Sequence, residues 1–440
     1  IKVLFRHIPC FKNMQYLRIV QGNSRFIKDD VMPGAQGFTI SRVLSLLILA
    51  MTAEASNTFL FAYTLTNIAD DFRLTWATTA LLGFGPQITG VIGGQFIGLI
   101  ADTRGRRVGL AASILLSALG AVATGLSSNL WEMVTARVIS GLTLAGTWTA
   151  CTTLINETVP EYARGRGTAM VQVGFPLGNL LCSALVVLFS GSWGWRGTFL
   201  GLALILFICG VLIVLWIPES KVWSDNRLRE KKGVERNPRI MSEIFSRPFR
   251  RNTFLAIVIS IFCIFGGFSI HTGIPTLLLS IGFRTEEIPN WSALVWAVAV
   301  VGYSSFGFIA DRFGRKKVFL IFLLGAFATS LLLGTVVPLL QGLGALGLAQ
   351  ALSIGFLAVI MYFTGFFPGI GVLYSSLFPV RIRATAIGLT FNAGRIGNAL
   401  SPYISRVLSE QVGFGKGLIL STLPLLAASM VVLALPDKSE

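Results

Sequence analysis

Long apolar stretches, separated by short polar segments, recur along almost the whole chain. A transmembrane helix needs roughly 17–25 predominantly apolar residues, and twelve suitable stretches can be placed along this sequence. Helices are the expected form, because lipid offers backbone N–H and C=O groups no other partner. The pattern therefore predicts an all-α integral membrane protein. The predicted spans are 41–66, 76–101, 108–127, 130–156, 166–190, 197–217, 253–280, 290–310, 318–337, 352–377, 384–407 and 415–436.

Two groups of six spans lie on either side of one long polar segment. We expect an N-terminal six-helix bundle at 41–217 and a C-terminal six-helix bundle at 253–436, joined by a basic loop at 218–252. Residues 1–40 form a polar, basic tail ahead of the first span. The region 338–351, between the ninth and tenth spans, is apolar but rich in Gly and Pro, which favours an outer loop or a short surface helix.

Composition supports a membrane protein over other classes. Apolar residues make up 53% of the chain and charged residues 13%, against about 25% charged residues in a typical soluble protein. This excludes a soluble enzyme, a disordered chain or a nucleic-acid-binding domain as a description of the whole. The sequence contains no Walker-type phosphate loop, no His/Cys cluster with metal-ligand spacing and no nucleophile–base constellation. We therefore expect no enzyme, no cofactor and no metal.

The net charge of +16 has two candidate origins. One is a nucleic-acid partner, and the other is the collection of basic residues on the cytoplasmic side of a membrane protein. With the N-terminus inside, 29 Lys and Arg fall in cytoplasmic segments, five in outer segments and two within spans. This bias predicts cytoplasmic N- and C-termini in a multi-pass protein of the plasma (inner) membrane, and no nucleic-acid partner.

The N-terminal tail does not resemble a signal peptide, because no short apolar core and small-residue cleavage site follow its basic residues. It begins with Ile, and Met14 and Met32 are candidate internal starts, so we interpret part of it as over-translation. The five cysteines show no CxxC spacing, and four of them lie within spans. We interpret them as packing residues.

Two similar segments occupy matched positions in the two groups of spans. Residues 98–107 and 307–316 both follow the pattern G-x-x-x-D-x-x-G-R-(R/K), and each joins the second and third spans of its group. A second similarity relates 164–169 to 381–386. We interpret the halves as duplicates, related like the parallel repeats known in transporters.

These paired signature segments, in a layout of six plus six spans, resemble the signature loop of the major facilitator superfamily (MFS). The first copy departs from the family pattern at Thr103, where a basic residue is usual. The resemblance covers about 41–436. It implies the MFS fold, with twelve transmembrane helices in two pseudo-symmetric six-helix bundles around a central cavity, and transport by alternating access.

In similar proteins the signature segments form a cytoplasmic gate that opens as the bundles rock. Asp102 and Asp311 end inward-running helices, where an anion opposes the helix dipole. We therefore expect each to serve a partner, such as the N-terminus of a neighbouring helix or an arginine of the 4–5 or 10–11 loop. The alternative is that these loops only supply positive charge on the inner side. The residues assigned to the gate are Gly98, Asp102, Arg106, Arg107, Gly307, Asp311, Arg312 and Arg315.

Glu54 is the one acidic residue placed deep inside a predicted span. A charge at the bilayer centre costs about 2.5–3.5 kcal/mol on insertion scales, which makes such a residue a functional candidate. Burial favours the neutral form of a carboxyl group, and a nearby arginine favours the charged form. A carboxyl group that alternates between such surroundings binds H⁺ facing one side and releases it facing the other. Glu54 is therefore the candidate proton-coupling residue, and the alternative is a permanent pair with Arg137.

Arg395 lies near the middle of the eleventh span, between small residues and one turn after Asn392. Its planar fork of donors matches a carboxylate in bidentate fashion, and the alternative is a structural pair between helices. Arg137 in the fourth span and His271 in the seventh are further candidates, with relay, structural or packing roles as alternatives. The candidate substrate-binding residues are Arg395, Arg137, Asn392 and His271.

Other polar and aromatic residues are candidates for the cavity wall, although the faces of their helices cannot be assigned from the sequence. These residues are Trp148, Tyr303, Tyr362, Tyr374, Gln95, Gln172 and Asn179. Gly90, Gly94 and Gly98 form small-xxx-small steps in the second span. We expect them to let helices pack closely.

Within the superfamily, several segments resemble the metabolite:proton symporters, which carry aromatic acids, sialate or monocarboxylates. Residues 271–278 are similar to their W-L-P-T-x-L segment without its Trp. Residues 377–385 and 392–395 are similar to their L-F-P-T-R-I-R-A-T and Y-N-x-G-R segments. The chain departs from this group at 53–57, where a single acid replaces the usual D-G-F-D-like acidic pair.

Two neighbouring groups match less of the chain. Sugar porters share the P-E-S sequence at 218–220, but their glutamine-rich motif in the seventh span is absent. Drug:proton antiporters carry a glycine- and proline-rich motif in the fifth span, which 174–179 matches only in part.

We therefore expect a secondary active transporter that moves a small organic anion, a carboxylate metabolite, with H⁺ by alternating access. Its expected partners are this anion, H⁺ and the lipid bilayer, and the chain is expected to act as a monomer. The alternatives are a proton-coupled multidrug efflux antiporter or a sugar porter of the same superfamily. From other classes, a receptor-like scaffold and a channel are disfavoured by the paired signature segments.

Overall fold

The computed structural model describes residues 33–160, 164–225, 243–374, 377–378 and 380–435. The chain divides at Ser41 into two units, and only 33–41 of the first is described. The account below concerns the second unit, Arg42–Glu440. Most of the predicted tail and residues 226–242 of the predicted basic loop lie outside the described residues.

All regular secondary structure in the described residues is α-helical. The helices are α1 (Pro33–Asp71), α2 (Trp76–Arg104), α3 (Arg106–Leu126), α4 (Leu130–Thr158), α5 (Arg164–Gln172), α6 (Gly174–Trp216), α9 (Arg250–Ser280), α10 (Ile288–Phe313), α11 (Arg315–Gly342), α12 (Leu346–Phe363), α13 (Phe366–Tyr374), α14 (Val380–Ala393), α15 (Arg395–Val412) and α16 (Phe414–Leu433).

These helices account for all twelve predicted spans. α6 holds parts of two spans, because Gly194, with φ 60° and ψ −161°, turns the chain inside it. Three spans consist of two helices in series: α5 with the start of α6, α12 with α13, and α14 with α15. In the described chain, ten segments are long and apolar enough to cross a membrane by length and composition. The remaining two spans are α2 and the α14–α15 pair.

The expectation of a loop or short surface helix at 338–351 is wrong. α11 continues through Pro338 to Gly342, and α12 begins at Leu346. Gly344, with φ 75°, lies in the short turn between the two helices. The helix continues through the proline because a lost hydrogen bond near a helix end costs less than a longer unpaired backbone segment in lipid.

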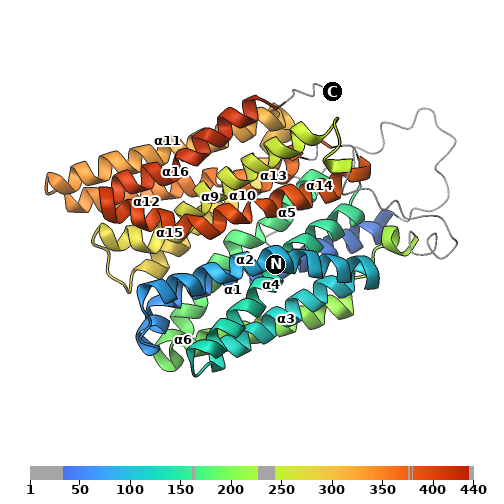
Figure 1. The fold of residues 1–440 in the computed structure, drawn as a ribbon, viewed down its shortest axis with the longest axis horizontal. Helices are drawn as coiled ribbons and strands as arrows, with labels where there is room; N and C mark the ends of the chain where they lie inside the picture. The colour runs from blue at the N-terminus through green and yellow to red at the C-terminus, as the bar shows by residue number, and fades with distance from the viewer. Residues whose placement is uncertain (1–32, 161–163, 226–242, 375–376, 379, 436–440) are drawn as a thin grey trace. The chain divides into compact units, whose positions relative to one another are not determined.

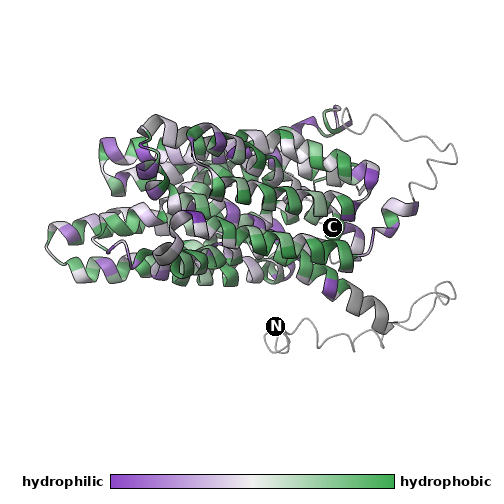
Figure 2. Ribbon diagram, turned by 90° about the horizontal axis from the view of Figure 1, so that it is seen from below, coloured by the Kyte–Doolittle hydropathy of each residue, from purple (hydrophilic) through white to green (hydrophobic). Residues whose placement is uncertain are grey.

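The helices form two groups that lie side by side, α1–α4 with α6 and α9–α16 (Figure 1). Helices of the same group pack extensively on one another, as α2 does on α4 and α9 on α16. Between the groups, α2 packs on α15 and α6 on α10, while α5 contacts both α4 and α13. Apolar residues cover the helix bodies, and hydrophilic residues gather near helix ends (Figure 2). The fold is the pair of six-helix bundles that the sequence resemblance implied.

Glycines allow the closest helix contacts in both bundles. A side chain at Gly93 on α2 would overlap the backbone of Leu142 on α4. A side chain at Gly302 on α10 would overlap the backbone of Tyr362 on α12. Gly302 follows Gly93 by 209 residues, the same offset that separates the signature segments. Lipid provides no hydrophobic drive for helices to associate, so such small residues allow the van der Waals contacts that hold them together.

We expect Gly93→Ala to lower the thermal stability of the purified protein, because the added methyl group forces α2 away from α4. Overpacking of this kind costs about 1–3 kcal/mol. Gly83→Ala on the same helix is the matched control, since a Cβ there meets nothing within 4 Å. Thermal unfolding in detergent distinguishes the two variants. Equal melting temperatures for both would contradict the close α2–α4 contact.

Candidate transport site

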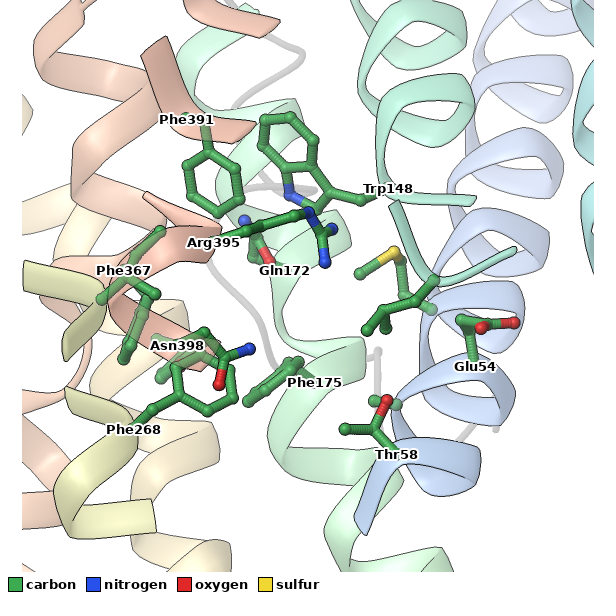
Figure 3. Close-up of a pocket in the computed structure, with 15 residues that line it drawn as sticks. Glu54, Thr58, Trp148, Gln172, Phe175, Phe268, Phe367, Phe391, Arg395 and Asn398 are labelled. Atoms are coloured by element: carbon green, nitrogen blue, oxygen red, sulfur yellow. The ribbon is translucent and has the colours of Figure 1, made fainter. Parts of the chain in front are cut away.

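A cavity of about 70 Å³ lies between the two bundles (Figure 3). Its wall draws on α1, α4, α5 and α6 from one bundle and on α9, α10, α13, α14 and α15 from the other. The lining residues are Met51, Glu54, Ala55, Thr58, Leu144, Trp148, Gln172, Phe175, Ile264, Phe268, Tyr303, Phe367, Phe391, Arg395 and Asn398.

Three interruptions of the helices border the cavity wall. Near Val173, Gly365 and Gly394, backbone N–H groups donate to the carbonyl three residues earlier, at 3.2, 3.1 and 3.0 Å. These shorter turns replace the regular α-helical pattern, as is common at functional hinges. Lining residues flank each interruption, such as Phe367 after Gly365 and Arg395 after Gly394.

Arg395 is the basic residue of the cavity wall. Its Nε donates to Oδ1 of Asn392 at 3.1 Å, which orients the guanidinium group and leaves its terminal amino groups for a ligand. A Cβ on Gly90 would lie 3.6 Å from Nη1 of Arg395, so the glycine of α2 leaves room for this side chain. The sequence analysis expected Gly90 only to let helices pack closely. In the structure it also leaves room for the side chain of Arg395.

Trp148 contributes a second donor beside Arg395. Its side chain is 5% exposed, and its Nε1 has no hydrogen-bond partner. Both side chains line the cavity (Figure 3). Buried donors in proteins nearly always have an acceptor. The unpaired indole N–H of Trp148 is a feature that the sequence did not predict.

Glu54 lines the cavity with its stem, but its carboxyl group points away from the other labelled residues (Figure 3). Thr143 Oγ1 donates to Oε1 of Glu54 at 3.1 Å, while Oε2 has no partner. Arg137 lies with its guanidinium carbon 4.0 Å from the centroid of the Phe61 ring, and its Nε and Nη1 are unpartnered. The structure records no ion pair between Glu54 and Arg137, so the alternative of a permanent pair is not seen here.

The other nominated residues lie outside the lining. Asn392 acts on the cavity through Arg395, and His271 is packed between Trp296 and Phe367, with ring centroids 4.6 and 5.3 Å away. Of the candidate wall residues, Trp148, Gln172 and Tyr303 line the cavity. Tyr374, Asn179 and Tyr362 hydrogen-bond elsewhere, to the Ala256 carbonyl, Tyr63 and Ser305 respectively. The side chain of Gln95 lies outside the described residues.

Contacts between the bundles border the cavity. Trp148 on α4 stacks on Phe391 on α14, with centroids 4.0 Å apart and planes at 9°. Elsewhere Asn398 Nδ2 donates to Gln87 Oε1 at 2.7 Å, which joins α15 to α2. Phe175 on α6 also packs on the rings of Phe268 and Trp296. These contacts join the two bundles around the cavity.

The two signature segments make different contacts. Asp311 in the second pairs with Arg166 on α5 and so joins the two bundles, which is a partner of the expected type. A Cβ on Gly307 would contact Ala169 and Arg166, so this glycine lies beside the pair. Arg312 packs 5.5 Å from the centroid of Phe313.

In the first segment, Asp102 pairs with Arg106, four residues later in the same segment. Arg106 also pairs with Glu157 at 3.1 Å. The backbone N–H groups of Arg106 and Arg107 donate to Glu219 at 2.8 and 3.2 Å. Glu219 thus occupies the positive N-terminus of α3, which had been considered as a partner for Asp102. Neither of these two partners was predicted from the sequence. Glu219 lies in the P-E-S sequence at 218–220, whereas no motif marked Glu157.

Two duplicated six-helix bundles around a cavity with a buried arginine define a membrane transport protein. A family model described as Major Facilitator Superfamily matches residues 46–402. The chain belongs to the major facilitator superfamily, and it is a transporter rather than an enzyme.

Curated relatives extend over most of the chain. It is 26% identical over 369 residues to the sialic acid transporter NanX of Escherichia coli (strain K12), covering 82% of this chain and 85% of NanX. It is 28% identical over 375 residues to a cis,cis-muconate transport protein of Acinetobacter baylyi, covering 84% and 88%. It is 25% identical over 379 residues to a gentisate transporter of Corynebacterium glutamicum, covering 81% and 80%. The resemblance to the metabolite:proton symporter branch is thereby confirmed.

Solved structures support the fold. The proton:xylose symporter XylE, bound to 6-bromo-6-deoxy-D-glucose, superposes with a TM-score of 0.75 at 19% identity. The match covers 91% of this chain and 96% of XylE. At this identity the likeness concerns the fold alone.

We expect Asp311→Asn to loosen the end of the molecule at which the signature segments lie, because it removes the ion pair between the bundles. The pair is partly exposed, and exposed ion pairs contribute about 0.2–1 kcal/mol to stability. The ratio of molecules with separated bundles to molecules with paired bundles should therefore rise by up to about fivefold. Spin labels at Thr103→Cys and Lys317→Cys, in a background without native cysteines, report the separation. Asp102→Asn is the control, since its partner lies in the same bundle. Equal distance distributions in the two variants would contradict the expected effect.

Proposed function

We propose that the protein carries a small organic anion with a carboxylate group through the cavity between its bundles. The observation that supports this most is the pair of donors, Arg395 and Trp148, in a cavity wall that also holds five other aromatic side chains. A guanidinium group and an indole N–H donate hydrogen bonds and accept none. A carboxylate complements both, and its aromatic or unsaturated body would pack on the surrounding phenylalanines. The relatives named for sialic acid, muconate and gentisate are consistent with this class of substrate.

Glu54 is the proton site in this proposal. Its carboxyl group is 2% exposed, with one oxygen free of partners and unpaired with any arginine. Protonation would remove the cost of this buried charge, and Arg137, stacked on Phe61, lies within the same bundle to compensate for the charge when the proton leaves. Substrate binding and protonation of Glu54 would influence each other through the cavity wall, to which both Glu54 and Arg395 belong. This influence would couple transport of the anion to transport of H⁺.

Transport would proceed by alternating access between the bundles. Trp148 and Phe391 would separate at one end of the cavity and the Phe175 contacts at the other. The proposed cytoplasmic gate consists of the signature segments, with the Asp311–Arg166 pair as its contact between bundles. The 29-to-5 distribution of basic residues supports cytoplasmic termini and a place in the plasma membrane. The chain would act as a monomer, because one chain supplies both walls of the cavity.

Proteoliposomes with purified protein should accumulate benzoate or another small carboxylate when the outside is acidic, and only equilibrate it without a pH gradient. Arg395→Lys should weaken carboxylate binding about 10–100-fold while retaining the charge, because a bidentate charged hydrogen bond is lost. Trp148→Phe is the companion variant, since it retains the stacked ring but removes the N–H. Measured uptake and binding affinity check both.

Two outcomes would reject this proposal. Export of cationic dyes without carboxylate uptake would favour the efflux antiporter, and saturable uptake of a neutral sugar would favour the sugar porter. Unchanged affinity in Arg395→Lys would remove that residue from the site.

Glu54→Gln should abolish accumulation driven by the pH gradient and leave exchange of labelled for unlabelled carboxylate intact. The amide imitates the protonated carboxyl group and cannot release a proton. Thr143→Val, which removes the donor to Oε1, is a milder variant and should retain coupling. Full accumulation by Glu54→Gln would exclude Glu54 as the proton site.

A further inference from the structure

Three buried side chains near one wall of the cavity hold polar atoms without partners. His271, Trp296 and Tyr303 are 3%, 0% and 1% exposed. Both ring nitrogens of His271, Nε1 of Trp296 and the hydroxyl of Tyr303 have no hydrogen bond. Buried polar groups in proteins nearly always have a partner, and a buried group left unpaired is destabilising. A cluster of such groups therefore points to a ligand.

Two of these side chains, His271 and Tyr303, lie against Phe367, which lines the cavity, and Trp296 lies against His271. The ring centroid of Phe367 lies 5.3 Å from that of His271 and 6.3 Å from that of Tyr303. His271 and Trp296 are 4.6 Å apart. Trp296 and Tyr303 are seven residues apart on α10 and so share one face of that helix. The cluster thus begins at the cavity wall with Tyr303 and continues behind it to His271.

The rings that separate His271 from the cavity form a thin layer. Phe175, Phe268 and Phe367 all line the cavity. Their centroids lie 5.9, 5.6 and 5.3 Å from that of His271. Figure 3 shows Phe175 and Phe268 on the side of the cavity opposite Trp148 and Phe391. His271 is therefore one side chain away from the space that Arg395 faces.

The size of the cavity requires its wall to widen when a ring-bearing acid binds. The cavity measures about 70 Å³, whereas an engineered cavity that accepts benzene measures about 150 Å³. A carboxylate held by Arg395 and Trp148 leaves the body of the ligand to extend away from them. In that direction the phenylalanine layer gives way to the unpartnered atoms of His271 and Trp296.

We propose that His271, Trp296 and Tyr303 form a distal subsite, which binds a neutral hydrogen-bonding group at the end of the substrate opposite its carboxylate. A neutral imidazole offers one donor and one acceptor, an indole one donor, and a phenol both. This mixture suits a hydroxyl group, which itself both donates and accepts. The substrate class is thus a hydroxylated aromatic monocarboxylate. The inference rests on the proposed carboxylate site at Arg395.

Binding of benzoate and 4-hydroxybenzoate to the purified full chain tests the distal subsite. The wild type should bind 4-hydroxybenzoate about tenfold more tightly, as one to two net hydrogen bonds would give. His271→Phe and Tyr303→Phe keep an aromatic ring and remove polar atoms. Each should reduce this preference toward equality while leaving the affinity for benzoate nearly unchanged. Arg395→Lys is the matched control, because it should weaken both acids and preserve their ratio.

The outcomes separate the two proposals. A tenfold preference that survives in both His271→Phe and Tyr303→Phe overturns the distal subsite alone. Tighter binding of terephthalate than of 4-hydroxybenzoate also overturns it, because the second group would then be charged. Binding of neither acid to the wild type overturns the carboxylate site, and with it this inference.

Discussion

The lack of water in the bilayer core is the constraint on which this structure depends. Backbone N–H and C=O groups there must pair within the protein, so the chain crosses as helices. Irregular backbone is tolerated only where protein surrounds it or a cavity borders it. The interruptions near Val173, Gly365 and Gly394 obey this rule, since cavity residues flank each of them. The same breaks that shorten the helices place Phe367 and Arg395 at the wall.

The unpaired groups proposed for the anion and for the proton lie in different places. In the cavity, Arg395 and Trp148 present donors only. Inside the first bundle, Glu54 presents an unpaired acceptor, turned away from the cavity. This separation suits the proposed co-transport, because an anion and a proton would occupy different sites that share one wall. A single site holding both charges would only neutralise them.

The duplication of the halves is visible in the packing but not in the ion pairs. Gly93 and Gly302 stand at equivalent positions, and each lets its helix touch a neighbouring backbone. The signature segments have nearly the same sequence, yet only Asp311 pairs across the bundles. Asp102 stays within its own segment, because Glu157 and Glu219 engage Arg106 and the start of α3. Partners outside the repeat therefore decide what each copy does.

The sequence by itself determined the twelve helices, the duplicated bundles and the family, because hydrophobic length and a repeated motif are local properties. It also singled out Glu54 and Arg395 as candidate site residues, since a charge within a span is conspicuous, and both line the cavity. Only the tertiary structure decided that the Glu54 carboxyl turns inward, that Trp148 faces Arg395 and that His271 lies behind a phenylalanine layer. In a helix that is apolar on every side, no hydrophobic periodicity marks which face meets the cavity. That choice is made by contacts between helices distant in the sequence.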